Sequence, residues 1–138
     1  MLLGTYRLNL IGKNRLTLPM KLRKELAGNR LVLTIGFEEC VMGFEEKKWE
    51  EVTASDLSRP LSDSVGRDLR RKMCTEAMVI ALDSQGRFVV PEVMMEYSGI
   101  KNKLTIIGAG DHFEIWDNER WDVYRQGLDK QKVDGSVS

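Results

Sequence analysis

The same order of hydrophobic and polar positions occurs twice in this chain. Sliding the sequence over itself brings Arg15 onto Arg87 at an offset of 87 − 15 = 72 residues, and the match continues without a gap from residue 8 to about residue 50. The identical pairs are Leu10 and Leu82, Arg15 and Arg87, Pro19 and Pro91, Ile35 and Ile107, Gly36 and Gly108, and Trp49 and Trp121. Self-similarity at a fixed spacing indicates a repeat architecture. The pattern therefore predicts a tandem duplication of a unit of roughly 45 residues, plus a linker.

Each unit has the pattern of four short strands and two helices. Apolar-rich runs predict strands at residues 5–10, 15–18, 31–35 and 40–44, and again at residues 77–82, 87–90, 103–107 and 112–116. Pro19 and Pro91 are expected at the first position of a short helix, which Gly28 and Gly99 should end. Acidic residues open two longer predicted helices, at residues 45–55 and 117–128, and the linker should contain another at residues 62–73.

A unit of this size is too small to enclose a hydrophobic core alone. The two copies should therefore pack on each other in one α+β domain. We expect a first repeat at residues 1–56, a linker helix at 57–76, a second repeat at 77–128 and a flexible tail at 129–138.

Composition narrows the class of protein. The 138 residues are 42% hydrophobic and 30% charged, which disfavours fibrous and disordered classes. Apolar runs stay well short of the ~20 residues that span a bilayer, so a soluble, cytoplasmic protein without a membrane partner is expected. Cys40 and Cys74 cannot form a disulfide framework and are expected to be reduced, mostly buried thiols.

Charge is balanced overall but segregated along the chain. Lys and Arg number 21, as do Asp and Glu. Residues 1–30 nevertheless carry seven basic side chains against one acidic one, whereas residues 38–56 carry seven acidic against two basic. Because salt confines an electrostatic field to ~8 Å, a basic face can bind phosphate on a neutral molecule. The acidic segment is expected to face away from such a partner.

The strongest candidate site follows the first turn of each unit. Asn14 and Gly86 occupy the same slot and both tolerate a positive φ, which predicts a tight hairpin. Arg15 and Arg87 come next. The guanidinium group of arginine can donate two hydrogen bonds at once, to O6 and N7 of guanine. Their recurrence favours base contacts by a two-stranded ribbon in double-stranded DNA over solvated arginines paired with acids.

Further basic side chains near the first turn are candidate phosphate contacts, namely Lys13, Lys21, Arg23 and Lys24. A solvated helix face around residues 21–24 explains the last three equally well.

Catalytic and metal-binding patterns are missing from the sequence. Residues 108–110 lack the third glycine of a dinucleotide fingerprint, and neither a GxSxG nor an HExxH motif occurs. His112 is the only histidine, without a second histidine or a cysteine at ligand spacing. We therefore expect no enzyme, cofactor, metal site or evident small-molecule substrate. The remaining aromatic and methionine positions are expected to fill the core: Phe44, Trp49, Trp116, Trp121, Met78, Met94 and Met95.

Three segments resemble the MraZ family, within the broader AbrB-like superfamily. They are residues 83–91 (DSQGRFVVP), with an Asp-x-x-x-Arg motif, residues 1–6 (MLLGTY) and residues 107–116 (IGAGDHFEIW). The resemblance, which extends to about residue 128, implies a tandem-duplicated, swapped-hairpin AbrB-like β-barrel with peripheral helices, assembled into ring-shaped homo-oligomers. It also implies a nucleoid-associated transcriptional regulator of G-rich direct repeats in the promoter of a division and cell-wall gene cluster.

The first copy departs from this family pattern, because Ile11 stands where an Asp is expected. Asp83 should shape its turn by accepting backbone N–H groups, and Gly86 and Asn14 should shape theirs by adopting a positive φ. Ile11 has no acceptor, so Arg15 should be held less rigidly than Arg87.

Two other functions stay open. A protein-interaction module of the AbrB-like antitoxin type is the main alternative, although such antitoxins are usually single-copy with an extended C-terminal segment, whose place the second copy takes here. A small-ligand-binding barrel is a third possibility.

Overall fold

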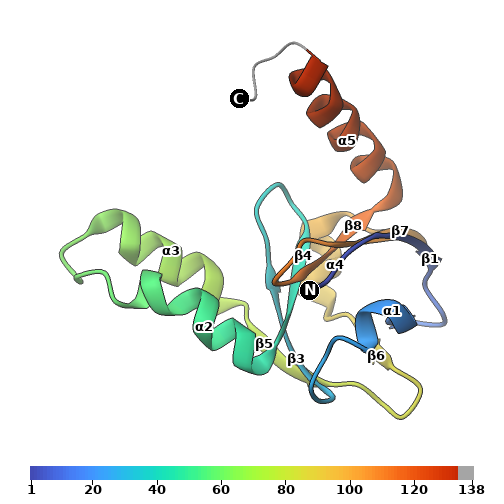
Figure 1. Ribbon diagram of the computed structural model, residues 1–138, viewed down its shortest axis with the longest axis horizontal. Coiled ribbons are helices and arrows are strands. Elements are labelled where there is room, and N and C mark those ends of the chain that lie inside the picture. Colours follow the sequence, from blue (N-terminus) through green and yellow to red (C-terminus); the bar gives the residue numbers. More distant parts are fainter. Residues whose placement is uncertain (134–138) are drawn as a thin grey trace.

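The computed structural model describes residues 1–133 (Figure 1). The elements, in chain order, are β1 (Thr5–Asn9), β2 (Arg15–Thr17), α1 (Met20–Arg23), β3 (Arg30–Ile35), β4 (Val41–Glu45), α2 (Glu46–Leu57), α3 (Ser64–Thr75), β5 (Met78–Ala81), β6 (Arg87–Val89), α4 (Glu92–Ser98), β7 (Lys103–Gly108), β8 (Phe113–Asp117) and α5 (Asn118–Val133). The α+β class and the repeated element order are confirmed.

The two repeats are interleaved in one antiparallel sheet of order β1-β7-β8-β4-β3-β5. The first strand of each repeat pairs with the third strand of the other, so Leu8 of β1 lies opposite Leu104 of β7 and Ile80 of β5 lies opposite Leu31 of β3. At the centre β4 pairs with β8. The remaining strands, β2 and β6, pair with each other in a separate two-stranded ribbon.

A closed barrel is not found within residues 1–133. The large sheet ends in two edge strands, β1 and β5, which lie at opposite sides of it. The barrel expected from the resemblance is therefore replaced by an open sheet with a separate ribbon.

Both faces of the sheet are covered, because side chains of the central strands alternate between two cores. Leu33 and Ile106 belong to the core that also contains Leu16 and Phe88 of the ribbon. Met42 and its neighbours form a second core with side chains from α3 and α5 on the opposite face. The aromatic residues expected in the core lie in or against this second cluster: Phe44, Trp49, Trp116 and Trp121. The sheet is thus the middle of three layers.

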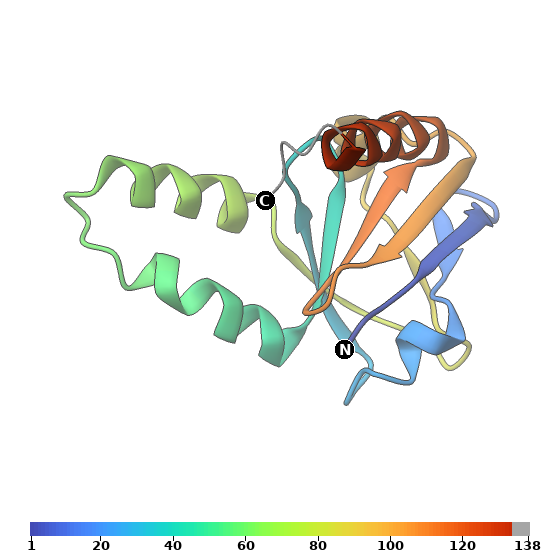
Figure 2. The same cartoon turned by 45° about the horizontal axis from the view of Figure 1, so that its top comes forward.

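Helices α2 and α3 form a hairpin that projects from the sheet, while α5 covers the other end of the same face (Figure 2). Asp63 caps α3 by accepting a hydrogen bond from the Val65 N–H at 3.1 Å. The helix that was expected at residues 62–73 therefore begins after this cap. Helix α5 continues to Val133, through part of the predicted tail, and residues 134–138 lie outside the described residues.

Helix ends differ in part from the sequence-based expectations. Pro19 and Pro91 are the residues before the first helical position, since their ψ angles of 138° and 144° are extended. Gly99 ends α4 with a φ of 67°, as predicted, but Gly28 does not end α1. The first helix stops at Arg23 because only its Leu22 is buried, whereas α4 buries several side chains that support a longer helix.

Two residues predicted to be buried are exposed. Cys40 is buried as expected, but Cys74 is exposed near the end of α3. Met78 is 46% exposed because it lies on the edge strand β5, whereas Met94 and Met95 are buried. Within the described residues, no helix has the length and apolar character needed to cross a bilayer.

The close approach of β4 and β8 gives a test of the shared core. Gly43 lies opposite Phe113, and a Cβ at residue 43 would come within 2.2 Å of the buried Phe113 ring. Gly43→Ala should therefore lower the free energy of unfolding by about 1–3 kcal/mol, measured by urea denaturation.

Gly28→Ala is the matched control, because a Cβ there meets no atom within 4 Å. It should change the free energy of unfolding by less than about 1 kcal/mol. Equal effects of the two substitutions would contradict the observed packing of β4 against β8.

Candidate nucleic-acid interface

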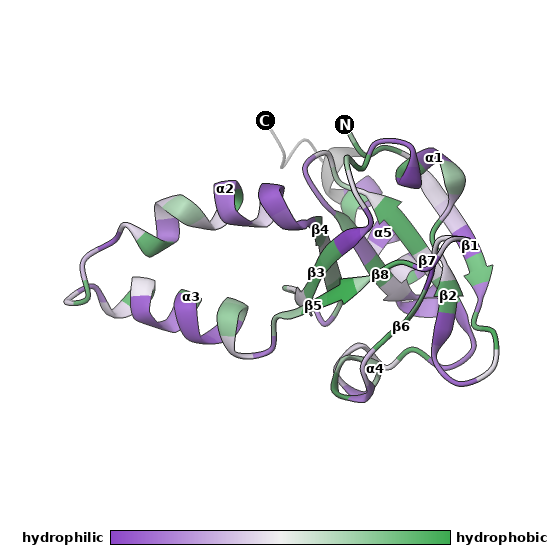
Figure 3. Ribbon diagram, turned by 90° about the horizontal axis from the view of Figure 1, so that it is seen from below, coloured by the Kyte–Doolittle hydropathy of each residue, from purple (hydrophilic) through white to green (hydrophobic). Residues whose placement is uncertain are grey.

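The ribbon of β2 and β6 places the two duplicated arginines on one surface. Leu16 lies opposite Phe88, and both side chains are buried in the core. Because side chains alternate along a strand and paired residues share a face, Arg15, Thr17, Arg87 and Val89 all point outward. Arg15 and Arg87 are diagonal neighbours on this outer face, at a typical separation of roughly 7–8 Å. The ribbon lies on the side of the molecule away from the α2–α3 hairpin (Figure 3).

Asp83 holds the turn before β6 and also holds Arg87. Its Oδ1 accepts hydrogen bonds from the backbone N–H groups of Gln85 and Arg87, both at 2.9 Å, and its Oδ2 accepts one from Arg87 Nε at 2.8 Å. These bonds and the positive guanidinium lower the pKa of the Asp83 carboxyl to about 2. Gly86 completes the turn with a φ of 78°. The carboxylate is thus charged at neutral pH and fixes the direction in which Arg87 leaves the strand.

The turn before β2 keeps the backbone closure but lacks the carboxylate. The Ile11 N–H donates to the Arg15 carbonyl oxygen at 2.7 Å, as the Asp83 N–H does to Arg87 at 3.0 Å. Asn14 has a φ of 60°, so it fills the slot of Gly86 in the left-handed conformation that was predicted. Arg15 is exposed, and within the described part of the chain its guanidinium has no hydrogen-bond partner.

Each turn is anchored by the other repeat. The Asn14 carbonyl oxygen accepts a hydrogen bond from the Val90 N–H at 2.8 Å, and its side-chain amide donates to Glu92 at 3.0 Å. In the second turn, the Gly86 carbonyl oxygen accepts from the Leu18 N–H at 2.9 Å. The ribbon and its turns are therefore fixed by contacts that neither repeat could make alone.

The other predicted phosphate contacts are distributed unequally around this surface. Lys13 is exposed in the first turn, next to Arg15. Arg23 is half-buried and donates to the Ser84 carbonyl oxygen at 2.8 Å, so it supports the second turn. Lys21 and Lys24 are exposed on α1 and at its end, and within residues 1–133 no hydrogen bond joins them to the ribbon. Lys13, Arg15 and Arg87 thus form the coherent part of the predicted set.

Sequence reasoning missed two side chains of the outer face, Thr17 and Val89. Both are exposed between or beside the arginines. The period-two alternation around Leu16 and Phe88 was the signal that could have identified them.

His112 is held by acidic partners. Its Nδ1 lies 2.7 Å from Asp111 Oδ1, its Nε2 lies 3.0 Å from Glu114 Oε2, and its ring stacks on Phe44. Burial opposes protonation, but the hydrogen bonds and charges of the two carboxylates outweigh it and raise the pKa of His112. Among the described side chains, no group of three potential metal ligands occurs. His112 thus lies between two carboxylates and packs on Phe44.

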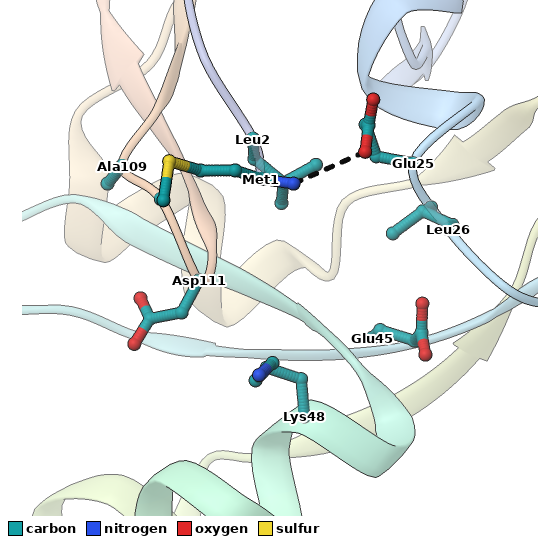
Figure 4. A pocket seen from close by; sticks show the side chains of 9 residues that line it. Met1, Leu2, Glu25, Leu26, Glu45, Lys48, Ala109 and Asp111 are labelled. Atoms are coloured by element: carbon teal, nitrogen blue, oxygen red, sulfur yellow. Dashed lines mark hydrogen bonds and ion pairs between the residues drawn. The ribbon is translucent and has the colours of Figure 1, made fainter.

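The pocket beside the N-terminus, of about 510 Å³, has the wrong charge for a phosphate site (Figure 4). Its acidic side chains, Glu25, Glu45 and Asp111, outnumber the basic Lys48. The Met1 amine lies 3.2 Å from Glu25 and is paired with it. The residues that line this pocket come from both repeats and include none of β2 or β6. The pocket is therefore separate from the ribbon that carries the arginines.

The fold and the site define a two-repeat α+β protein that presents arginines on a paired β-ribbon. A family model described as "MraZ protein, putative antitoxin-like" matches residues 1–72 and again residues 73–134. The chain belongs to the MraZ family.

Relatives in several bacteria carry the name "Transcriptional regulator MraZ". The protein of Micrococcus luteus is 44% identical over 124 residues, which cover 90% of this chain and 86% of the relative. That of Paenarthrobacter aurescens is 40% identical with the same coverage. That of Roseiflexus castenholzii is 34% identical, covering 94% of this chain and 90% of the relative. The similarity therefore includes both repeats.

The His112 contacts predict a pH dependence of stability. A group whose pKa is raised on folding stabilises the fold below its ordinary pKa, here 6.5, and this contribution is lost as the pH rises through the raised value. His112→Gln should therefore lower the free energy of unfolding more at about pH 5.5 than at about pH 9. Denaturation of both proteins at the two pH values measures this, and an equal loss at both would contradict the charged contact.

Proposed function

We propose that this chain is a DNA-binding transcription regulator that contacts base edges with the outer face of the β2–β6 ribbon. The observation that carries the proposal is the common exposed face of Arg15 and Arg87, which the pairing of Leu16 with Phe88 fixes. The name that the relatives carry, transcriptional regulator, describes a non-enzymatic role and supports the same conclusion.

A two-stranded ribbon such as β2–β6 suits the major groove of DNA. That groove is about 12 Å wide and admits a two-stranded β-ribbon. Arginine binds guanine O6 and N7 in a two-pronged contact, which supports recognition of G-rich direct repeats. Lys13, exposed near Arg15, would contact phosphate, and Lys21 and Lys24 would extend such contacts along α1. A promoter of a division and cell-wall gene cluster, at the nucleoid in the cytoplasm, is the target that the family resemblance implies.

The fold supports a finer assignment as well. The exchange of first strands between the repeats, β1 onto β7 and β5 onto β3, supports the swapped-hairpin arrangement of the AbrB-like superfamily.

Internal symmetry supports self-assembly through α5. Val52 of α2 packs against the core that Met73 of α3 helps to form. At the offset of 72 residues, Tyr124 of α5 corresponds to Val52 (124 − 52 = 72), yet Tyr124 is 37% exposed and the nearby Leu128 is 43% exposed. We propose that a second copy of the chain covers this face of α5 with its projecting α2–α3 hairpin, in a head-to-tail contact that closes into a ring.

DNA binding is tested by competition between a G-rich direct-repeat duplex and a scrambled duplex at ~0.15 M salt, where contacts to phosphate alone are weakened. The wild-type protein should prefer the repeat, and the double variant Arg15→Ala/Arg87→Ala should lose about tenfold or more of that preference. Lys130→Ala is the control and should retain it, because it removes an exposed basic side chain on the side of α5 that carries Gln126, away from the proposed contact. A wild-type protein without any preference would overturn the proposal and favour the protein-interaction alternative.

Self-assembly is tested by sedimentation velocity. The wild-type chain should sediment as an oligomer, and Tyr124→Glu/Leu128→Glu should shift it toward the monomer, because two carboxylates would be buried in the contact. Gln126→Glu adds a charge to the same helix on the opposite side and should leave the oligomer intact. A monomeric wild-type protein would contradict this part of the proposal.

A further inference from the structure

The first turn of the ribbon has Ile11 at the position that Asp83 occupies in the second turn, and this difference reaches the DNA-contacting side chains. Asp83 binds both the turn backbone and the guanidinium of Arg87, whereas Ile11 binds only through its backbone N–H. We infer that the two arginines contact DNA unequally: Arg87 discriminates strictly at one base pair, Arg15 tolerates substitutions at its own, and positions 83 and 11 set this asymmetry. The inference rests on the proposed function.

Arg87 is oriented before DNA binds. One of its five donors, the Nε–H, is held by Asp83 at 2.8 Å, and the guanidinium is therefore attached along one side. The two terminal nitrogens remain available to form the two-pronged contact with guanine. The same carboxylate fixes the Arg87 backbone N–H, so both ends of the side chain are positioned. A guanidinium held in one orientation cannot turn to match the donors and acceptors of a different base. The contact that Arg87 makes is therefore selective.

Arg15 must be ordered when DNA binds. Its side chain is exposed, and the residue that replaces the aspartate, Ile11, is 55% exposed and has no acceptor in its side chain. An unrestrained arginine loses rotamer freedom on binding, and it can also move to a phosphate or to a neighbouring base. Arg15 therefore adds affinity with little selectivity.

The positioning role of Asp83 can be separated from its role in the turn. In Asp83→Asn the amide oxygen can still accept from the backbone N–H groups, but the NH₂ group that replaces Oδ2 cannot accept from Arg87 Nε. This variant should keep the turn and release the guanidinium. The reciprocal variant is Ile11→Asp, which places a carboxylate at the position of Asp83 and keeps Gly12, whose φ of 56° favours glycine.

The test measures affinity for a set of duplexes that each carry one base-pair substitution in the repeat. The wild-type protein should have one position at which substitution weakens binding by about tenfold or more, and this sensitivity should vanish in Arg87→Ala. The position that depends on Arg15 should show less than about threefold sensitivity. In Asp83→Asn, which should remain folded, binding should become as tolerant at the Arg87 position as at the Arg15 position. In Ile11→Asp, substitution at the Arg15 position should weaken binding by about tenfold or more.

The outcomes separate this inference from the function on which it rests. A wild-type protein that does not prefer the repeat overturns both. A protein that prefers the repeat but discriminates equally at the Arg15 and Arg87 positions overturns the asymmetry alone. Full discrimination in Asp83→Asn would show that the Asp83 side chain shapes the turn without positioning Arg87.

Discussion

Pairing between the repeats is the constraint on which the rest of this structure depends. The first strand of each repeat lies on the third strand of the other, and the ribbon consists of one strand from each. A single repeat would leave these strand edges and their apolar faces exposed, which is costly for a unit of this size. The two copies therefore form one core, and the surface they share is the one that carries the arginines.

This constraint explains how short strands can hold a binding surface. Each ribbon strand has only three residues, too few for an isolated hairpin to be stable. Leu16 and Phe88 attach the ribbon to the core, and the turns are bonded to the opposite repeat through Asn14 and Arg23. The side chains on the outer face of the ribbon do not pack in the core, so they are available for contacts with a partner.

Periodicity made much of this fold predictable. The offset that aligns Arg15 with Arg87 also aligned the strands and long helices, and the positive φ at Asn14 followed from its alignment with Gly86. The open sheet could not be derived in this way, because the local pattern does not state which strand pairs with which. Met78 was assigned to the core for the same reason: an edge strand has the same apolar composition as a central one. The support that Arg23 gives to the second turn depends on contacts between residues 61 positions apart in the chain.

The most direct test of the central claim is photocrosslinking from Thr17, which lies between the two arginines on the outer face of the ribbon. Thr17→p-benzoylphenylalanine should crosslink to a bound G-rich repeat duplex on irradiation, and the same substitution at Val123, exposed on α5, should not. Crosslinking from Val123 but not from Thr17, with the duplex bound in both cases, would show that DNA contacts another surface and would contradict the account.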